Sequence, residues 1–133
     1  MSLKDVCAAA APRLLSVMRI MSGLLFMQHG TAKLLGIPKM EMFAKLQPFT
    51  QSWTAGVLEL VGGALLVIGL FTRPVAFVLS GLMAFAYFIA HAPRGFYPIM
   101  NAGELAALYC FVFLYLAAAG GGAWSVDAMR KKD

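Results

Sequence analysis

Long apolar stretches run through most of this 133-residue chain and decide what it can fold into. Four of them, roughly residues 14–35, 53–71, 74–92 and 102–119, come close to the ~20 residues that a helix needs to cross a bilayer. Charged residues make up only 13% of the chain, against about 25% in soluble domains. A body this small cannot hide so much apolar surface from water. We therefore expect an all-helical membrane protein, which excludes a water-soluble enzyme.

The connections between these segments are short, and this favours an up-down-up-down bundle of four transmembrane helices in a single domain over residues 1–133. Lys and Arg are commoner on the side that holds both termini, and the positive-inside rule places that side in the cytoplasm. This side carries Lys4, Arg13, Arg73, Arg130, Lys131 and Lys132, and the other carries Lys33, Lys39, Lys45 and Arg94. No basic stripe is interleaved with aromatic residues, so we expect no nucleic-acid partner.

This topology brings polar residues from four helices to one level near the outer side of the membrane. The set comprises His29, Lys33, Glu59, His91, Asn101 and Glu104. Ionisable groups inside a membrane are costly and usually mark a functional site. A buried Glu59 needs a cation, a hydrogen-bond donor or a proton. His29, Lys33 and Arg19 are the available partners.

A quinone site fits this set best, because it needs an apolar slot at membrane depth with a proton donor for each carbonyl. We expect His29 and Glu59 to act as the catalytic proton donors. The expected substrate-binding residues are His29, Lys33, Glu59, His91, Asn101 and Glu104. No metal site is predicted, because the Glu-x-x-His pair of helical-bundle metal sites is missing. Haem held by His29 and His91 is disfavoured, because the chain has only two histidines.

Each of these polar residues also has a structural interpretation. Glu59 can form an ion pair that only fixes the register of two helices. Asn101 and Glu104 have the spacing of a capping box, which would start the fourth helix at Asn101. Lys33 and Arg19 can extend to the membrane surface with their charged ends in water. The chain carries no flavin fingerprint and no iron–sulfur cysteine set, so whether it catalyses a reaction alone stays open.

Several sequence blocks resemble those of the DoxX family and come in the same order. Residues 27–34, MQHGTAKL, are similar to its HG-x-x-KL block, and residues 58–63 with 69–73, LELVGG and GLFTR, to its E-x-x-GG…GL-x-TR segment. Residues 101–106, NAGELA, and 122–127, GAWSVD, resemble its NGGE-x-A and G-x-W/Y-S-x-D blocks, with Ala102 in place of the usual glycine. The matching polar residues are His29, Lys33, Glu59, Thr72, Arg73, Asn101, Glu104, Ser125 and Asp127.

The resemblance implies a multi-pass protein of the bacterial inner membrane. Some members of the family are similar to the membrane subunit of a thiosulfate:quinone oxidoreductase, and others are associated with redox-stress complexes. Our leading hypothesis is therefore a quinone-interacting subunit or membrane anchor of an oxidoreductase system, with protein partners from that system or a homo-oligomer. The alternative is a non-catalytic membrane scaffold that assembles partner proteins. Thr72 and Arg73 are expected to form an inner-side turn, and Ser125 to Asp127 a C-terminal cap or docking element.

Overall fold

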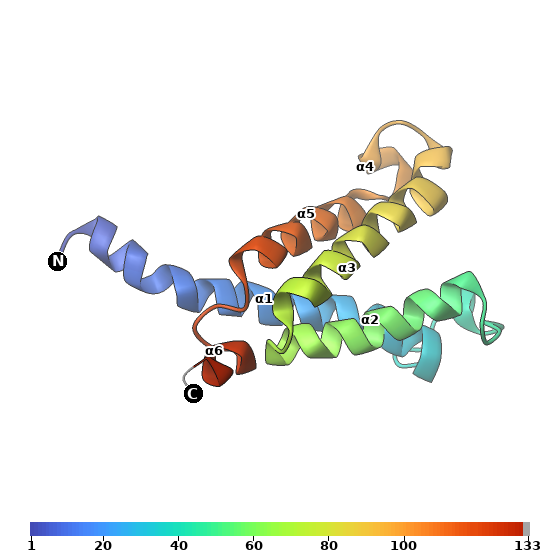
Figure 1. Ribbon diagram of the computed structural model, residues 1–133. Helices are drawn as coiled ribbons and strands as arrows, with labels where there is room; N and C mark the ends of the chain where they lie inside the picture. The colour runs from blue at the N-terminus through green and yellow to red at the C-terminus, as the bar shows by residue number, and fades with distance from the viewer. Residues whose placement is uncertain (132–133) are drawn as a thin grey trace.

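The computed structural model describes residues 1–131, and within them every regular element is a helix (Figure 1). Lys132, which the charge count includes, lies outside the described residues. The four long helices are α1 (Leu3–Leu35), α2 (Gln51–Ile68), α3 (Thr72–Ala86) and α5 (Glu104–Ala119). The shorter elements are η1 (Glu41–Phe43), η2 (Tyr87–His91), η3 (Ala92–Arg94), α4 (Pro98–Asn101) and α6 (Val126–Arg130). The prediction of an all-helical fold is confirmed.

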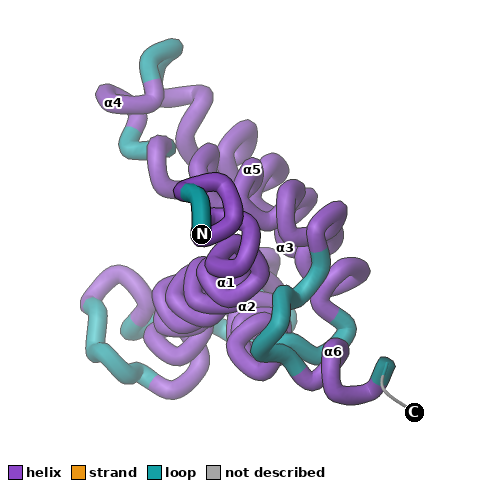
Figure 2. The backbone as a smooth tube through the Cα atoms, turned by 90° about the vertical axis from the view of Figure 1, so that its left-hand side faces the viewer, coloured by secondary structure: helices purple, strands orange, loops and turns teal. Residues whose placement is uncertain are grey.

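The long helices pack as two pairs, α1 with α2 and α3 with α5, and α2 also contacts α3. In Figure 1 the two pairs lie close together at the end that holds α6 and diverge toward α4. Figure 2 shows the same division from the N-terminal end. The pairs are joined by Phe26 of α1, whose ring meets those of Tyr109 and Phe113 edge-on at centroid distances of 5.4 and 5.0 Å.

Helix α1 begins eleven residues earlier than the apolar pattern indicates, at Leu3 in place of residue 14. Ser2 caps it, accepting a hydrogen bond from the Asp5 amide, while the Asp5 carboxylate accepts one from the Ser2 amide. The residues between carry a run of alanine, the strongest helix former, so the helix continues beyond the apolar stretch.

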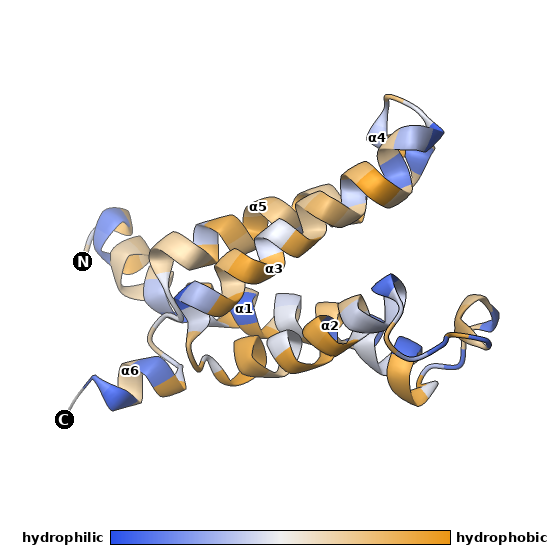
Figure 3. Ribbon diagram, turned by 45° about the vertical axis from the view of Figure 1, so that its right-hand side comes forward, coloured by the Kyte–Doolittle hydropathy of each residue, from blue (hydrophilic) through white to orange (hydrophobic). Residues whose placement is uncertain are grey.

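Within the described part of the chain, three helical stretches are long and apolar enough to cross a membrane: Leu3–Leu35, Gln51–Ile68 and Thr72–Arg94, the last formed by α3 with η2 and η3. Helix α5 is apolar but shorter, with 16 residues. It begins at Glu104 because Ala102 adopts a left-handed conformation, with φ 62°, and so separates α4 from α5. Figure 3 shows hydrophobic colour along the long helices and hydrophilic colour concentrated at their ends.

Large apolar side chains cover the outward faces of these helices. Val61, Phe77 and Phe111 are more than half exposed, whereas the buried core is a small group that includes Leu66, Leu79 and Phe113. An outward surface this apolar is suited to lipid and not to water. Fold and composition together describe an integral membrane protein.

Candidate functional site

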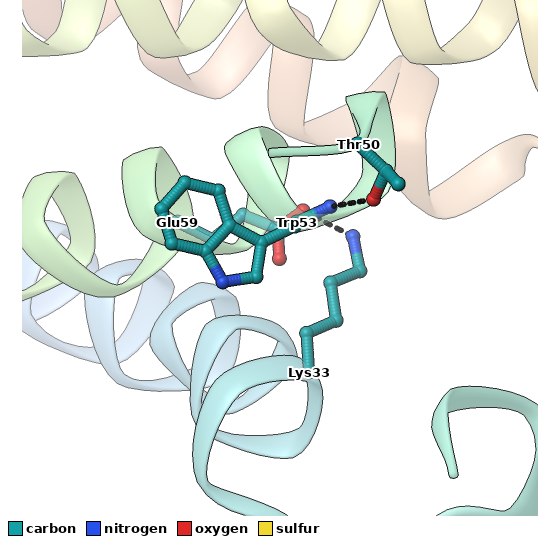
Figure 4. Close-up of polar contacts among 4 residues, drawn as sticks. All are labelled: Lys33, Thr50, Trp53 and Glu59. Atoms are coloured by element: carbon teal, nitrogen blue, oxygen red, sulfur yellow. Dashed lines mark hydrogen bonds and ion pairs between the residues drawn. The ribbon is translucent and has the colours of Figure 1, made fainter. Parts of the chain in front are cut away.

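Lys33 and Glu59 form a buried ion pair between α1 and α2. The Lys33 ammonium lies 2.7 Å from Glu59 Oε1, and the two side chains are 14% and 5% exposed. Figure 4 shows the Lys33 side chain reaching from α1 toward the carboxylate on α2. The second oxygen, Oε2, is buried and has no hydrogen-bond partner within residues 1–131. The pair thus keeps one buried acceptor oxygen unused between two apolar helices.

Glycines bring the two helices close enough for this pair to form. A Cβ placed on Gly30 would lie 2.5 Å from the Leu60 amide nitrogen and 2.7 Å from the Gly56 carbonyl oxygen. Gly63 is similarly close to Met27. Small residues at such crossings let helix backbones approach each other. The glycine spacing therefore fixes the α1–α2 register at which Lys33 faces Glu59.

His29 and Phe43 lie near the Lys33 end of this pair. His29 is one helical turn before Lys33, on the same face of α1, and its ring meets the Tyr109 ring of α5 edge-on at 6.5 Å. Phe43, from the loop between α1 and α2, places its ring centroid 5.6 Å from the Lys33 ammonium, within cation–π range. We call Lys33, Glu59 and His29 the Lys33–Glu59 site.

The structure separates the other three predicted site residues from this site. His91 and Asn101 lie where α3 and α5 meet α4, at the end where the two helix pairs have diverged (Figure 1). There the Asn101 side chain donates to the Gly95 carbonyl at 2.9 Å and to the Tyr87 hydroxyl at 3.2 Å, and His91 Nδ1 is 3.1 Å from the Asn101 carbonyl oxygen. This second group closes the α3–α5 turn.

The predicted capping box at Asn101 and Glu104 is wrong. Asn101 Oδ1 accepts a hydrogen bond from the Gly103 amide at 2.8 Å, across a two-residue turn before the helix. Helix α5 has Gly103 at its N-cap position and no side-chain cap. Glu104 is exposed and follows this turn. The turn takes precedence because the buried Asn101 side chain satisfies Gly95, Tyr87 and Gly103 at once.

Arg19 does not extend to the membrane surface, and it does not partner Glu59. Its side chain is 1% exposed, and its guanidinium donates to backbone carbonyls of α2 and of the segment after α5. Nε donates to Leu66 at 2.7 Å, Nη2 to Trp124 at 2.8 Å, and Nη1 to Gly121. A guanidinium has five rigidly placed N–H donors, so one side chain can join three segments. Arg19 thereby attaches the C-terminal segment to the middle of the molecule.

Ser16 and Asp127 complete this attachment. The Ser16 hydroxyl donates to the Gly121 carbonyl at 2.9 Å and accepts from the Trp124 amide at 2.9 Å. Asp127 accepts from the amides of Phe71 and Thr72 at 2.8 and 2.9 Å, so a residue of α6 caps the start of α3. The expectation of a capping or docking element at residues 125–127 is confirmed. Sequence reasoning missed Ser16, and a lone serine in an apolar helix gave no signal for it.

The pKa of Asp127 reflects two opposing effects. Partial burial raises the pKa of this carboxyl, whereas the Thr72 and Phe71 amides and the nearby Arg130 lower it. The lowering effects are larger, so the pKa lies below the ordinary value of 3.8. Asp127 is therefore ionised at neutral pH, as a helix N-terminus favours.

A pocket of about 650 Å³ opens beside this capped helix start. The first turn of α3, the end of α5 and helix α6 form its walls, and Arg73, Arg130 and Lys131 are its cationic residues. An apolar groove of about 250 Å³ runs between α2 and α3. Within residues 1–131, no three His, Cys, Asp or Glu side chains gather where they could hold a metal ion.

These features define an integral membrane protein built from two tightly packed helix pairs, with one buried ion pair in the first. The chain belongs to the DoxX family, which it matches over residues 14–92. It is 46% identical over 120 residues to an uncharacterized protein of Haemophilus influenzae (strain ATCC 51907 / DSM 11121 / KW20 / Rd), and the match covers 87% of this chain and 90% of that protein. No solved structure matches the chain.

Proposed function

We propose that the protein is a four-span subunit or anchor of an oxidoreductase system in the bacterial inner membrane, and that its Lys33–Glu59 site binds a quinone or quinol headgroup. The observation that carries this proposal is the unused Glu59 Oε2, buried within a membrane helix pair. Unpaired buried carboxylate oxygens are costly, and such groups in membrane spans usually serve a ligand or a proton.

The proposed topology has four spans with both termini in the cytoplasm. The larger set of Lys and Arg lies beside the termini and the α2–α3 turn, as the positive-inside rule requires. The Lys33–Glu59 site then lies toward the outer side, at a depth that a quinone headgroup reaches from within the bilayer.

The chemistry follows from the donors and acceptors present. A quinol carries hydroxyl protons, and the free Glu59 Oε2 is an acceptor for one of them. The Lys33 ammonium compensates the negative charge of the Glu59 carboxylate and orients this carboxylate. In this proposal His29, one turn before Lys33 on α1, exchanges the second proton. A bound quinone supplies the two-electron chemistry, and a partner subunit supplies or accepts the electrons.

Native mass spectrometry of the protein purified in mild detergent tests this assignment. We expect a quinone to stay bound to the wild type and to be lost in Glu59→Gln, because an amide cannot take up the proton. Glu104→Gln is the matched control, since Glu104 is exposed and separate from the pair. Quinone retained equally in Glu59→Gln, or absent from the wild type after reconstitution with quinone-containing lipid, would contradict the proposal.

A second candidate function is a membrane scaffold, and the glycine crossing favours it. The ion pair lies where Gly30 and Gly56 bring the backbones together, so it also suits a clamp that fixes one arrangement of α1 and α2. On this hypothesis Glu59→Gln, which removes the ion pair, and a bulky residue at Gly63 both reduce the co-purifying proteins, because each disturbs the arrangement of α1 and α2. Co-purification that survives a bulky residue at Gly63 would contradict it.

A further inference from the structure

The pocket beside α6 has a strong excess of positive charge. Its acidic residue is Asp127, and both carboxylate oxygens of Asp127 already accept amide hydrogens from the start of α3. Arg73, Arg130 and Lys131 are exposed on the pocket walls. Within residues 1–131, none of these three cations forms an ion pair. The pocket is therefore suited to an anion.

Two of these cations are held in place by the fold. The Arg130 guanidinium lies over the Phe71 ring, 5.1 Å from its centroid. Arg73 lies across the end of α5, where Nη2 is 3.4 Å from the Ala119 carbonyl oxygen. A Cβ on Gly120 would come within 3.0 Å of Arg73 Nε, so glycine leaves the space that Arg73 occupies. The charges are thus positioned before any ligand arrives, which lowers the entropy lost on binding.

The second cavity is apolar and lies next to the basic pocket. The groove between α2 and α3 is lined by apolar side chains and shares Pro74 with the basic pocket. From Leu65 it extends to Leu58, two turns away along α2 and about 10 Å at the rise of a helix. Val61 and Val78 on its walls are more than half exposed. A basic pocket continuous with an apolar groove along membrane helices matches a molecule with an anionic head and a hydrocarbon tail.

We propose that this composite site binds an anionic phospholipid, with its phosphate among Arg73, Arg130 and Lys131 and one acyl chain in the α2–α3 groove. Basic pockets at the cytoplasmic end of membrane helices recognise such headgroups, and each Lys or Arg near the phosphate adds to the affinity. The basic pocket lies beside the start of α3, and the groove lies between α2 and α3, whereas Glu59 points to Lys33 of α1. The proposal therefore does not depend on the quinone assignment.

The test is a competition between two lipids, read by native mass spectrometry of the full chain. The protein is incubated with equal amounts of phosphatidylglycerol and phosphatidylcholine that have identical acyl chains. We expect the wild type to retain phosphatidylglycerol preferentially, and the paired variant Arg73→Gln/Arg130→Gln to retain about thirtyfold less of it. The matched control is Lys4→Gln/Arg13→Gln, which removes two exposed charges from α1 and should bind as the wild type does.

Two more variants keep the test decisive. Arg130→Gln/Lys131→Gln changes only exposed residues near the C-terminal end of the described chain, so it lowers retention even if the Arg73 variant unfolds. Val78→Trp fills the groove and should lower the amount of phosphatidylglycerol retained, while the melting temperature of the protein stays unchanged. Glu59→Gln should retain phosphatidylglycerol fully, which separates this proposal from the quinone assignment.

Equal retention of the two lipids by the wild type would overturn the proposal, and so would an equal loss in Lys4→Gln/Arg13→Gln. The third contrary result concerns the source of the phosphate. If soluble glycerol phosphate displaces the lipid and Val78→Trp has no effect, the pocket binds a free phosphate compound and the lipid assignment is wrong.

Discussion

At the scale of single residues, Lys33 and Glu59 depend on each other, because each neutralises the other in a buried position. Removing one partner leaves an uncompensated charge, which costs about 3–5 kcal/mol in buried pairs, whereas replacing both is far less costly. We therefore expect Lys33→Met to lower the unfolding temperature in detergent strongly and Lys33→Met/Glu59→Met to recover most of that loss. The exposed Lys39→Met is the control. A double variant as unstable as the single one would show that the charges are not coupled.

Ala102 gives a second prediction at this scale. Its left-handed φ of 62° is unfavourable for a side chain with a Cβ and free of penalty for glycine. We expect Ala102→Gly to stabilise the protein by about 1 kcal/mol, measured by thermal unfolding. The control Ala64→Gly, at an exposed position inside α2, should destabilise it by about the same amount. Destabilisation by both changes would exclude the strained turn.

The sequence predicted which single residues need a polar partner better than it predicted which residue that partner is. It predicted that a buried Glu59 needs a cation, a hydrogen-bond donor or a proton, and included Lys33 among three candidate partners, because ionisable groups in membrane helices are costly. It could not choose Lys33 over Arg19, because the choice depends on which faces of α1 and α2 meet. Arg19 instead donates hydrogen bonds to backbone carbonyls. Every residue has a backbone carbonyl, so the sequence does not indicate which of them a buried arginine will bind.

At the scale of helices, Gly30 controls the α1–α2 contact. A methyl group there would overlap Leu60 and Gly56 backbone atoms, which cannot move as a flexible side chain can. We expect Gly30→Ala to push α1 away from α2, lower stability by about 1–3 kcal/mol and break the Lys33–Glu59 pair. Gly81→Ala is the matched control, since nothing lies within 4 Å of a Cβ there. Equal behaviour of the two variants would contradict this contact.

The cap that α6 provides for α3 predicts an acid-sensitive end of the molecule. The folded-state pKa of Asp127 lies below its ordinary value of 3.8. Its stabilisation is therefore complete above that value and is lost as the pH falls through the folded-state pKa. We expect the unfolding temperature to fall on acidification below about pH 4, and to fall less in Asp127→Asn, which has no charge to lose. Identical acid profiles for the two proteins would exclude this role.

Helix existence was predictable from the apolar runs, but helix ends were less so. The start of α1 at Leu3 depends on alanines and a Ser2 cap, which hydropathy does not register. The late start of α5 depends on the Asn101 turn, whose partners are Tyr87 of η2 and Gly95 in the connection after η3.

At the scale of the whole molecule, the proposed topology can be tested with the two native cysteines. Cys7 is exposed near the N-terminus, and Cys110 is half-buried in α5. With Cys110→Ser, we expect a membrane-impermeant maleimide to label Cys7 only after the inner membrane is permeabilised. A cysteine introduced at Arg94 in a cysteine-free background should react in intact spheroplasts. Labelling of Cys7 in intact spheroplasts would place the N-terminus outside.

The angle between the two helix pairs explains why the predicted outer cluster divides. The predicted topology placed six polar residues at a similar depth in the membrane. The sequence contains no information on how far apart they lie within the membrane plane. Lateral separation depends on Phe26, Tyr109 and the other side chains that join the pairs near their middle. As a result, His91 and Asn101 close a turn of their own.

The attachment of Arg19 has a consequence for the order in which the protein is made. The Arg19 guanidinium of the first helix is synthesised before Gly121 and Trp124, whose carbonyls accept hydrogen bonds from it in the folded protein. Until residues 121–124 are translated, that guanidinium has only the Leu66 and Val67 carbonyls at the end of α2 among its final partners from other elements. A chain that stops before Gly121 therefore leaves the Arg19 guanidinium without two of the carbonyl partners that the folded protein gives it.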